Sequence, residues 1–200
     1  MNARHIDYYF WLNSDWAYLG ADRLEALARR HRLEVRYKPV DLPLVYARTG
    51  GILLSQRALP RQAYRIVELR RWSRKLGLPV NPRPAFMCPD AGLASRIVIG
   101  AGMAGLPVAA LSRAILHAQW VENRDISSIV TLRAIVRGCG FDHEMLMAAA
   151  AEPAVARRYH ANTDEAIMAG VFGSPSYLFD GELFWGQDRL EMLEDRVAGA

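Results

Sequence analysis

Cysteine is scarce in this sequence: its 200 residues include only Cys88 and Cys139, which stand in no close motif. Disulfide frameworks and zinc sites need several ligands at short, regular spacings, so we expect neither, and no metal. Both cysteines are interpreted as small buried apolar residues rather than nucleophiles. No apolar stretch approaches the roughly 18 residues of a membrane span. Residues 1–7 also lack the apolar core of a signal peptide. The simplest expectation is a cytoplasmic protein without a membrane partner.

The chain also has no large excess of either positive or negative charge. The net charge is +4, and 23% of residues are charged against 52% hydrophobic, as in ordinary globular proteins. The basic group Arg70, Arg71, Arg74 and Lys75 falls in a predicted helix, where a solvated face is the simpler interpretation. Nucleic-acid binding needs a concentrated basic face, so no nucleic-acid partner is expected.

The first forty residues predict a strand, a helix and a second strand. Residues 6–12 are a nearly continuous run of apolar and aromatic side chains, typical of a buried central strand. Asn13-Ser14-Asp15 then offers N-cap chemistry for a helix that ends near residue 31. Residues 33–40 alternate with period two, as in a strand with one more polar face. This order predicts a βαβ unit with a parallel strand pair.

From about residue 41 to residue 162 the pattern is helical only, and it contains no repeats. An all-helical segment, residues 42–159, therefore interrupts an α/β part formed by residues 1–41 and 160–200. The expected helices are 61–76, 91–102, 108–120, 126–137 with Asp125 as its cap, 143–151 and 153–169.

Residues 170–190 predict a helix end, a β-hairpin and a new helix start. Gly170 is suited to the left-handed position that ends a helix. The short runs 176–179 and 182–185 are rich in aromatic residues, and Asp180-Gly181 between them favours a tight type I′ turn.

Pro175 stands at the start of the first of these strands, where proline is tolerated because it cannot donate to a ladder. A proline held in cis there would present the backbone of the preceding residue to an extended ligand, an arrangement that resembles the cis-proline loop of the thioredoxin fold. An ordinary trans proline is the alternative. Residues 186–189 then open the last helix with free N–H groups.

The chain as a whole resembles the 2-hydroxychromene-2-carboxylate isomerases, which are relatives of kappa-class glutathione transferases and DsbA-like proteins. The resemblance implies a thioredoxin-like domain, residues 1–41 and 160–200, with a large helical insertion at 42–159. It covers nearly the whole length and rests on Asp-Tyr-Tyr-Phe-Trp at 7–11 with Ser14 and Tyr18-Leu19, Lys38-Pro39-Val40, the segment 120–126, Asn162-Thr163 with Ala166, Gly-Val-Phe-Gly-Ser-Pro at 170–175 and Phe-Trp-Gly-Gln-Asp-Arg at 184–189.

The resemblance also implies a glutathione site. Ser14 matches the serine that activates the sulfur, and a helix N-terminus with a hydroxyl donor stabilises a thiolate. Ser14 as a plain N-cap remains an alternative, and so does Asp188 as an acid that only complements the last helix dipole. The residues implied to bind glutathione are Ser174 through its backbone, Pro175, Gln187 and Asp188 at the γ-glutamyl end, and Arg61 near a usual lysine position.

The implied reaction opens the cyclic hemiketal and isomerises it to trans-o-hydroxybenzylidenepyruvate by reversible addition of the thiolate. Four cations are candidates for the substrate carboxylate, with Lys38 in the best-matched context: Lys38, Arg61, Arg83 and Arg96. Five aromatic residues are candidate substrate walls or simple core residues, among them Tyr64 and Trp185: Tyr64, Trp72, Phe86, Trp120 and Trp185.

Two features of the first helix bear on the chemistry that the resemblance implies. Asp15 replaces the usual proline after Ser14, and its charge would raise the pKa of a nearby thiol unless the carboxylate turns to solvent. No Cys-x-x-Cys motif occurs at the first helix, which argues against disulfide exchange. The alternatives are a kappa-like transferase that forms stable conjugates and a DsbA-like binding protein without chemistry. Relatives imply a homodimer acting on a small aromatic substrate.

Overall fold

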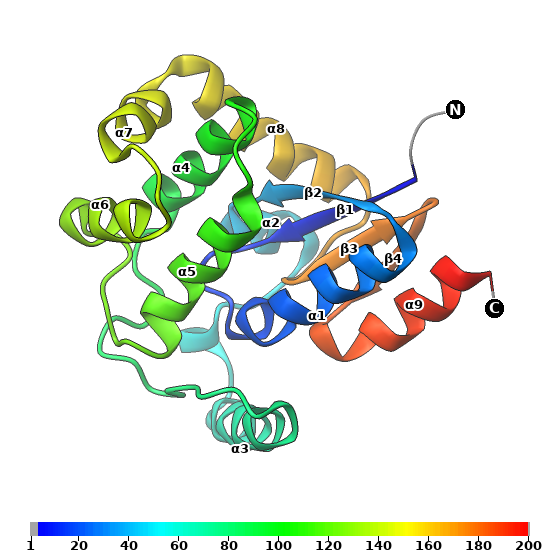
Figure 1. Cartoon of the computed structure of the whole chain (residues 1–200). Coiled ribbons are helices and arrows are strands. Elements are labelled where there is room, and N and C mark those ends of the chain that lie inside the picture. Colours follow the sequence, from blue (N-terminus) through cyan, green and yellow to red (C-terminus); the bar gives the residue numbers. More distant parts are fainter. Residues whose placement is uncertain (1–3, 200) are drawn as a thin grey trace.

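A four-stranded sheet forms the centre of the computed structural model, with strand order β2-β1-β3-β4 (Figure 1). The structure describes residues 4–199. β1 (His5–Phe10) pairs in parallel with β2 (Glu34–Pro39), whereas β3 (Ser176–Phe179) runs antiparallel to both β1 and β4 (Glu182–Trp185). The predicted βαβ unit and the predicted hairpin are both confirmed. They meet in one sheet, so the two ends of the sequence share a single core.

The helices lie close to their expected positions. Most boundaries differ by only a few residues, and the helix at 108–120 is found at the predicted bounds. The helices are α1 (Asp15–His31), α2 (Leu42–Thr49), α3 (Leu59–Leu76), α4 (Gly92–Met103), α5 (Val108–Trp120), α6 (Ile129–Gly138), α7 (His143–Ala151), α8 (Pro153–Met168) and α9 (Leu190–Ala198), with single 3-10 turns η1 (Leu54–Gln56) and η2 (Gln187–Arg189).

Two local expectations need correction. The sequence pattern did not predict α2, although Asp41 caps it by accepting a hydrogen bond from Leu44 N at 3.2 Å and Gly50 ends it at φ +80°. The cap of α6 is Ser128, whose Oγ accepts from Thr131 N, and not Asp125. Asp125 instead accepts hydrogen bonds from the backbone and hydroxyl of Ser127 at 2.9 and 2.6 Å, so its carboxylate stabilises the preceding turn.

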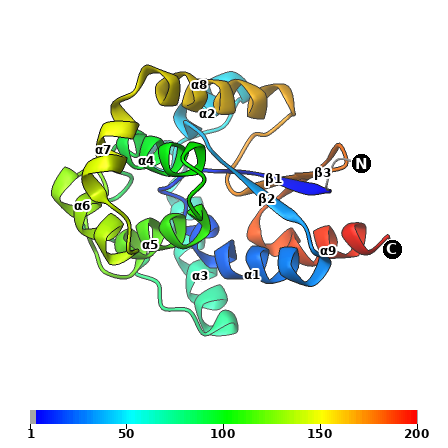
Figure 2. The ribbon, with the colours of Figure 1, turned by 45° about the horizontal axis from the view of Figure 1, so that its top comes forward.

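The alternation of side chains along β1 divides the core between two layers. Tyr8 and Phe10 stack at 4.4 Å and belong to the large apolar cluster that includes α1 and α9. Tyr9, on the opposite face, packs with Val40 and Val171. Figure 2 shows the result as α2 and α8 on one side of the sheet and α1 and α9 on the other. Packing of helices on both faces of the sheet holds the C-terminal end of β1 and the start of α1 in place, and the functional site forms there.

The C-terminal segment has the backbone that its sequence predicts. Gly170 has φ +79°, and the turn residues Asp180 and Gly181 have φ +49° and +82°, as a type I′ hairpin requires. The peptide bond between Ser174 and Pro175 is cis, so of the two conformations that the sequence left open the structure has the one that resembles the thioredoxin fold. The division of the chain at residues 159 and 160 remains a prediction; that point lies within the continuous helix α8.

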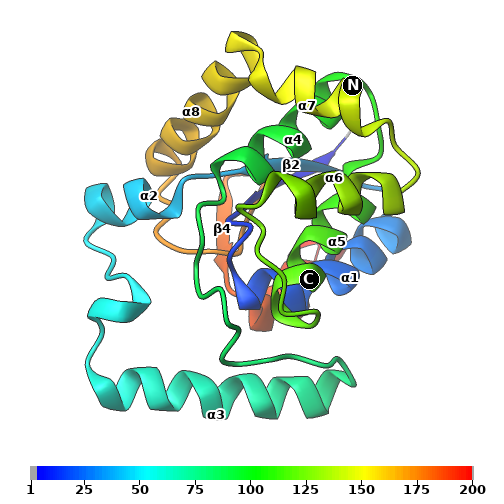
Figure 3. The same cartoon turned by 90° about the vertical axis from the view of Figure 1, so that its left-hand side faces the viewer.

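α3 stands apart from the rest of the molecule (Figure 3). Of its eighteen residues only Leu69 is buried, so α3 contributes little to the apolar core of the protein. Residues on its inner side nevertheless form part of the cavity described below.

Two helical glycines provide a matched test of packing in α1 and α6. A Cβ on Gly20 would lie 2.9 Å from Gln187 Cβ and 3.0 Å from the Tyr177 hydroxyl, whereas a Cβ on Gly138 meets nothing within 4 Å. We therefore expect Gly20→Ala to lower the free energy of unfolding by about 1–3 kcal/mol because it overpacks the contact between α1 and η2. Gly138→Ala should leave it unchanged or raise it by up to about 1 kcal/mol. Urea unfolding of both variants measures the difference; equal changes would show that Gly20 is not a packing constraint.

Candidate functional site

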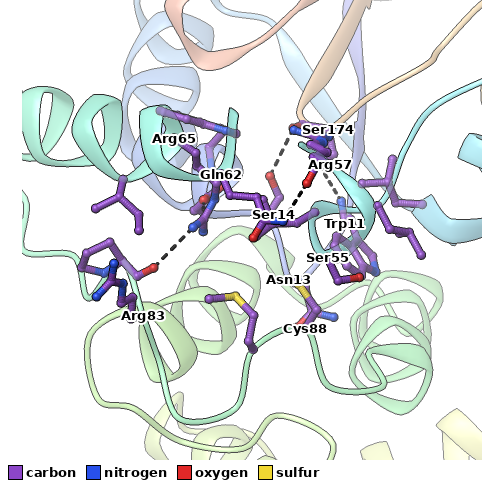
Figure 4. Close-up of a pocket in the computed structure, with 18 of the residues that line it drawn as sticks. Trp11, Asn13, Ser14, Ser55, Arg57, Gln62, Arg65, Arg83, Cys88 and Ser174 are labelled. Carbon is purple, nitrogen blue, oxygen red and sulfur yellow. Dashed lines mark hydrogen bonds and ion pairs between the residues drawn. The ribbon is translucent and has the colours of Figure 1, made fainter. Parts of the chain in front are cut away.

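A cavity of about 800 Å³ opens where the C-terminal end of β1 meets α1 (Figure 4). Its wall comes from four parts of the chain: the turn between β1 and α1, a stretch from α2 through α3 to the loop around Cys88, Trp120 at the end of α5, and Ser174 before β3. Its volume is that of an ordinary small-molecule site, and most of the exposed lining is apolar.

Ser14 connects the two ends of the chain in this cavity. Its Oγ accepts a hydrogen bond from Ala17 N at 3.1 Å, so it is the N-cap of α1. The same hydroxyl donates to the Ser174 carbonyl at 3.2 Å, and Trp11 N donates to Ser174 Oγ at 2.9 Å. Ser14 is therefore a cap and also a cavity residue in contact with the backbone beside Pro175. Both roles use one hydroxyl group.

Asp15 does not turn to solvent, contrary to the arrangement expected if a thiolate were to lie nearby. Its carboxylate is buried, accepts a hydrogen bond from Trp16 N at 2.8 Å and forms an ion pair with Arg65 Nη2. Burial raises the pKa of Asp15, while the Arg65 guanidinium acts in the opposite direction. The negative charge next to Ser14 is thus neutralised inside the protein.

Arg65, like Arg57, is a site residue that the sequence pattern missed. It reaches from α3 over the Trp120 ring, 5.4 Å from the centroid, and donates to the Pro82 carbonyl at 3.3 Å. The available signal was Asp15 itself: an acid beside a predicted buried strand requires a cation, because an unpaired buried charge is strongly unfavourable.

Three arginines face the cavity, Arg57, Arg65 and Arg83, against a single acid, Asp15, among the described residues of its wall. Arg57 is held by hydrogen bonds from Nε to the Ile52 carbonyl at 2.9 Å and from Nη2 to the Tyr46 hydroxyl at 3.2 Å. The excess of positive charge favours anionic ligands.

Cys88 was expected to be a buried apolar residue, and the structure contradicts this. It is exposed, has a left-handed backbone (φ +53°) and lies in the cavity wall. The neighbouring Pro89 carbonyl accepts a hydrogen bond from Asn13 Nδ2 at 2.7 Å, which fastens this loop to the start of α1. Although the residue as a whole is exposed, the surrounding protein partly desolvates its sulfur; this desolvation, and then the charge of Asp15, raise the pKa of the Cys88 thiol. The thiol is accordingly protonated at neutral pH and a poor nucleophile. Cys139 is half-buried.

Of the residues expected to hold glutathione, the structure brings Ser174 and the adjacent Pro175 to Ser14. Gln187 lies outside the cavity wall and is buried, and its side chain accepts a hydrogen bond from Arg23 Nη1 at 2.7 Å. Asp188 is exposed in the middle of η2, and its Oδ2 lies 3.3 Å from Arg189 Nη1.

Three of the expected substrate residues, Lys38, Tyr64 and Trp185, also lie outside the cavity wall. Lys38 forms ion pairs with Asp7 at 3.3 Å and Glu165 at 3.0 Å. Trp185 is half-exposed and packs on Phe172 with ring centroids 4.8 Å apart. Both Arg61 and Tyr64 lie on the exposed surface of α3. Of the aromatic candidates, Trp120 is the one that lines the cavity.

Within residues 4–199 no group of three or more His, Cys, Asp or Glu side chains is arranged to hold a metal ion. The helices of this part of the chain are all too short or too polar to cross a membrane.

Comparisons of this chain with family models, curated proteins and solved structures agree on one family. A family model described as a DSBA-like thioredoxin domain matches residues 5–198. The 2-hydroxychromene-2-carboxylate isomerase of Sphingobium xenophagum is 31% identical over 193 residues, which cover 96% of this chain and 97% of that protein. The protein of the same name from Pseudomonas putida is 31% identical over 197 residues, covering 96% and 93%. A solved structure of a 2-hydroxychromene-2-carboxylate isomerase superposes with a TM-score of 0.83 at 29% identity, covering 97% of this chain and 94% of the other.

Proposed function

This chain belongs to the DsbA-like thioredoxin family and, within it, to the 2-hydroxychromene-2-carboxylate isomerases, and from this premise we propose a glutathione-dependent isomerase. Its substrate would be 2-hydroxychromene-2-carboxylate or a related intermediate of aromatic catabolism, converted to the trans-benzylidenepyruvate form. The names of the relatives support isomerisation as the reaction. That the protein forms a homodimer and is located in the cytoplasm remains a prediction.

One observation carries the glutathione part of the proposal: a serine, not a cysteine, caps α1, and its hydroxyl contacts the Ser174 carbonyl beside the cavity. A disulfide-exchange enzyme needs its own reactive thiol at this helix start, whereas a hydroxyl here can only assist a thiol that is supplied from outside. The polar groups present fit such a ligand. Ser14 and Ser174 are available to its sulfur and backbone, and Arg57 to a carboxylate.

Two residues expected at the cofactor do not fit that role directly. The side-chain oxygen of Gln187 is already engaged by Arg23. Arg61 is exposed outside the cavity wall, while Arg57 lies within it. Asp188 is exposed and retains a carboxylate that could receive an ammonium group.

Bound at this position, glutathione would supply a thiolate that adds reversibly to the conjugated double bond and so permits rotation about it. Ser14 would turn its single O–H proton from the Ser174 carbonyl to the sulfur, and the N-terminus of α1 would add a favourable field. Arg65 would keep Asp15 neutralised, so that the acid does not oppose the negative sulfur. The apolar wall would exclude water from the reacting carbons.

The test is to incubate the protein with glutathione and the chromene carboxylate and to follow both compounds by chromatography. We expect the trans product to accumulate while the glutathione concentration stays constant. S-Methylglutathione, which lacks a free thiol, should not support the reaction. Loss of glutathione into an adduct would instead indicate a transferase. Absence of reaction, together with no thermal shift in millimolar glutathione, would leave only a binding protein of this fold.

A further inference from the structure

We propose that Arg83 is the residue that binds the substrate carboxylate and so determines the preference for acids; the identity of the substrate rests on the proposed function. Of the four candidate cations, Lys38 is ion-paired with Asp7 and Glu165 outside the cavity wall. Arg96 donates its Nε hydrogen bond to the Ala150 carbonyl at 3.1 Å. Arg61 is exposed on α3. Arg83 alone among these four lies in the wall.

The other two arginines of the wall already have partners, and the proposed function assigns the remaining N–H groups of Arg57 to a carboxylate of glutathione. Arg65 is ion-paired with Asp15, and Arg57 makes two hydrogen bonds through its guanidinium. Within residues 4–199, the side chain of Arg83 has neither a hydrogen-bond nor an ion-pair partner, so all of its N–H donors are available. A free guanidinium beside a largely apolar cavity is well matched to a planar carboxylate, which it can bind through two parallel hydrogen bonds.

The backbone that carries Arg83 is held in place. Arg83 N donates to Asn81 Oδ1 at 3.0 Å, and Asn81 N donates to the Trp120 carbonyl at 2.6 Å. Pro82 and Pro84 flank the arginine and restrict the chain on both sides. Because little backbone freedom is left to lose, only the side chain has to be ordered when a ligand binds.

The position of Arg83 relative to Ser14 is compatible with this role. In the view of Figure 4, Arg83 and Arg57 lie on opposite sides of Ser14. A ligand whose carboxylate is held by Arg83 can extend its conjugated carbons toward Ser14. The carboxylate would then orient the substrate without contacting the reacting atoms, which makes Arg83 a positioning residue.

Binding of a product-like probe tests the proposal without turnover or glutathione. Calorimetry with trans-2-hydroxycinnamate and with its uncharged carboxamide would be run on the wild-type protein, Arg83→Gln and Arg83→Lys. We expect Arg83→Gln to weaken binding of the acid by about 30-fold and of the amide by less than about 2-fold, since only the acid forms the charge-assisted pair. Arg83→Lys should recover part of the loss, because lysine restores the charge without the planar fork.

The matched control is Arg70→Gln, which removes the same charge from an exposed position on α3. It should leave both affinities unchanged, which separates a specific contact from a change in overall charge. The proposal is overturned if the wild-type protein binds acid and amide equally, if Arg83→Gln weakens both to the same degree, or if Arg70→Gln has the same effect. A protein that passes this test but does not isomerise the chromene carboxylate would refute the proposed function and leave the carboxylate site standing.

Discussion

Replacing Ser14 with alanine should reduce kcat/KM for the proposed isomerisation by about 10²–10³-fold, because it removes the hydroxyl that we propose to donate to the glutathione sulfur. The same change removes the cap of α1, which should lower the free energy of unfolding by only about 1 kcal/mol. The two effects can be measured separately, by steady-state kinetics with saturating glutathione and by urea unfolding. A loss of activity much larger than the loss of stability can explain would identify the hydroxyl as part of the chemistry.

Ser128→Ala is the matched control, because Ser128 caps α6 through the same kind of hydrogen bond, to Thr131 N at 3.4 Å. It should produce a similar loss of stability and leave kcat/KM unchanged. The ultraviolet absorbance of bound glutathione gives a second readout: its thiolate signal should appear at lower pH with the wild-type protein than with Ser14→Ala. If Ser14→Ala is as active as Ser128→Ala, Ser14 is a helix cap and nothing more.

Replacing Arg65 with methionine should lower the free energy of unfolding by about 3–5 kcal/mol, because Asp15 would stay buried without its cation. Arg113→Met provides the comparison. Arg113 pairs with Asp22 at 3.4 Å, and both side chains are more than half exposed, at 57% and 56%. An exposed pair of this kind contributes less than about 1 kcal/mol. Equal effects of the two substitutions in urea unfolding would show that the Asp15–Arg65 pair has no special role.

The pH dependence of the Arg65→Met variant should identify Asp15 as the cause. Burial raises the pKa of Asp15 in the folded state, and loss of Arg65 removes the charge that opposes this shift. In the unfolded chain the pKa of an aspartate is about 3.9. The folded variant therefore binds more protons than the unfolded chain, and its stability rises as the pH falls through the raised pKa of Asp15. We expect the destabilisation to be largest at neutral pH and to shrink on acidification. A penalty that is independent of pH would point to lost packing of the arginine stem instead.

The sequence predicted the elements whose local signals agree with their packing. β1 is apolar on both faces because it lies centrally in the sheet, and Asp180-Gly181 fits the turn conformation that joins β3 to β4. The contact between Ser14 and the segment before β3 was expected from the family resemblance and is present in the structure.

The wall contributed by α3 could not be predicted in the same way. A helix is normally oriented by its apolar stripe, but α3 buries only Leu69, so periodicity does not tell which arginines face inward. The sequence pointed to Arg61, whereas the structure places Arg57 and Arg65 in the wall. Cys88 was misjudged for a related reason: it lies in an irregular loop, where burial depends on tertiary contacts that leave no pattern in the sequence.

The strand order has a consequence for synthesis on the ribosome. β1 lies between β2 and β3, and β3 is encoded after the entire helical block. At a synthesis rate of about 5–20 residues per second, β3 is made roughly ten to thirty seconds after β1. Until then one edge of β1 has no strand partner. During this interval the nascent chain exposes unpaired backbone N–H and C=O groups along one edge of β1, which can pair with other chains.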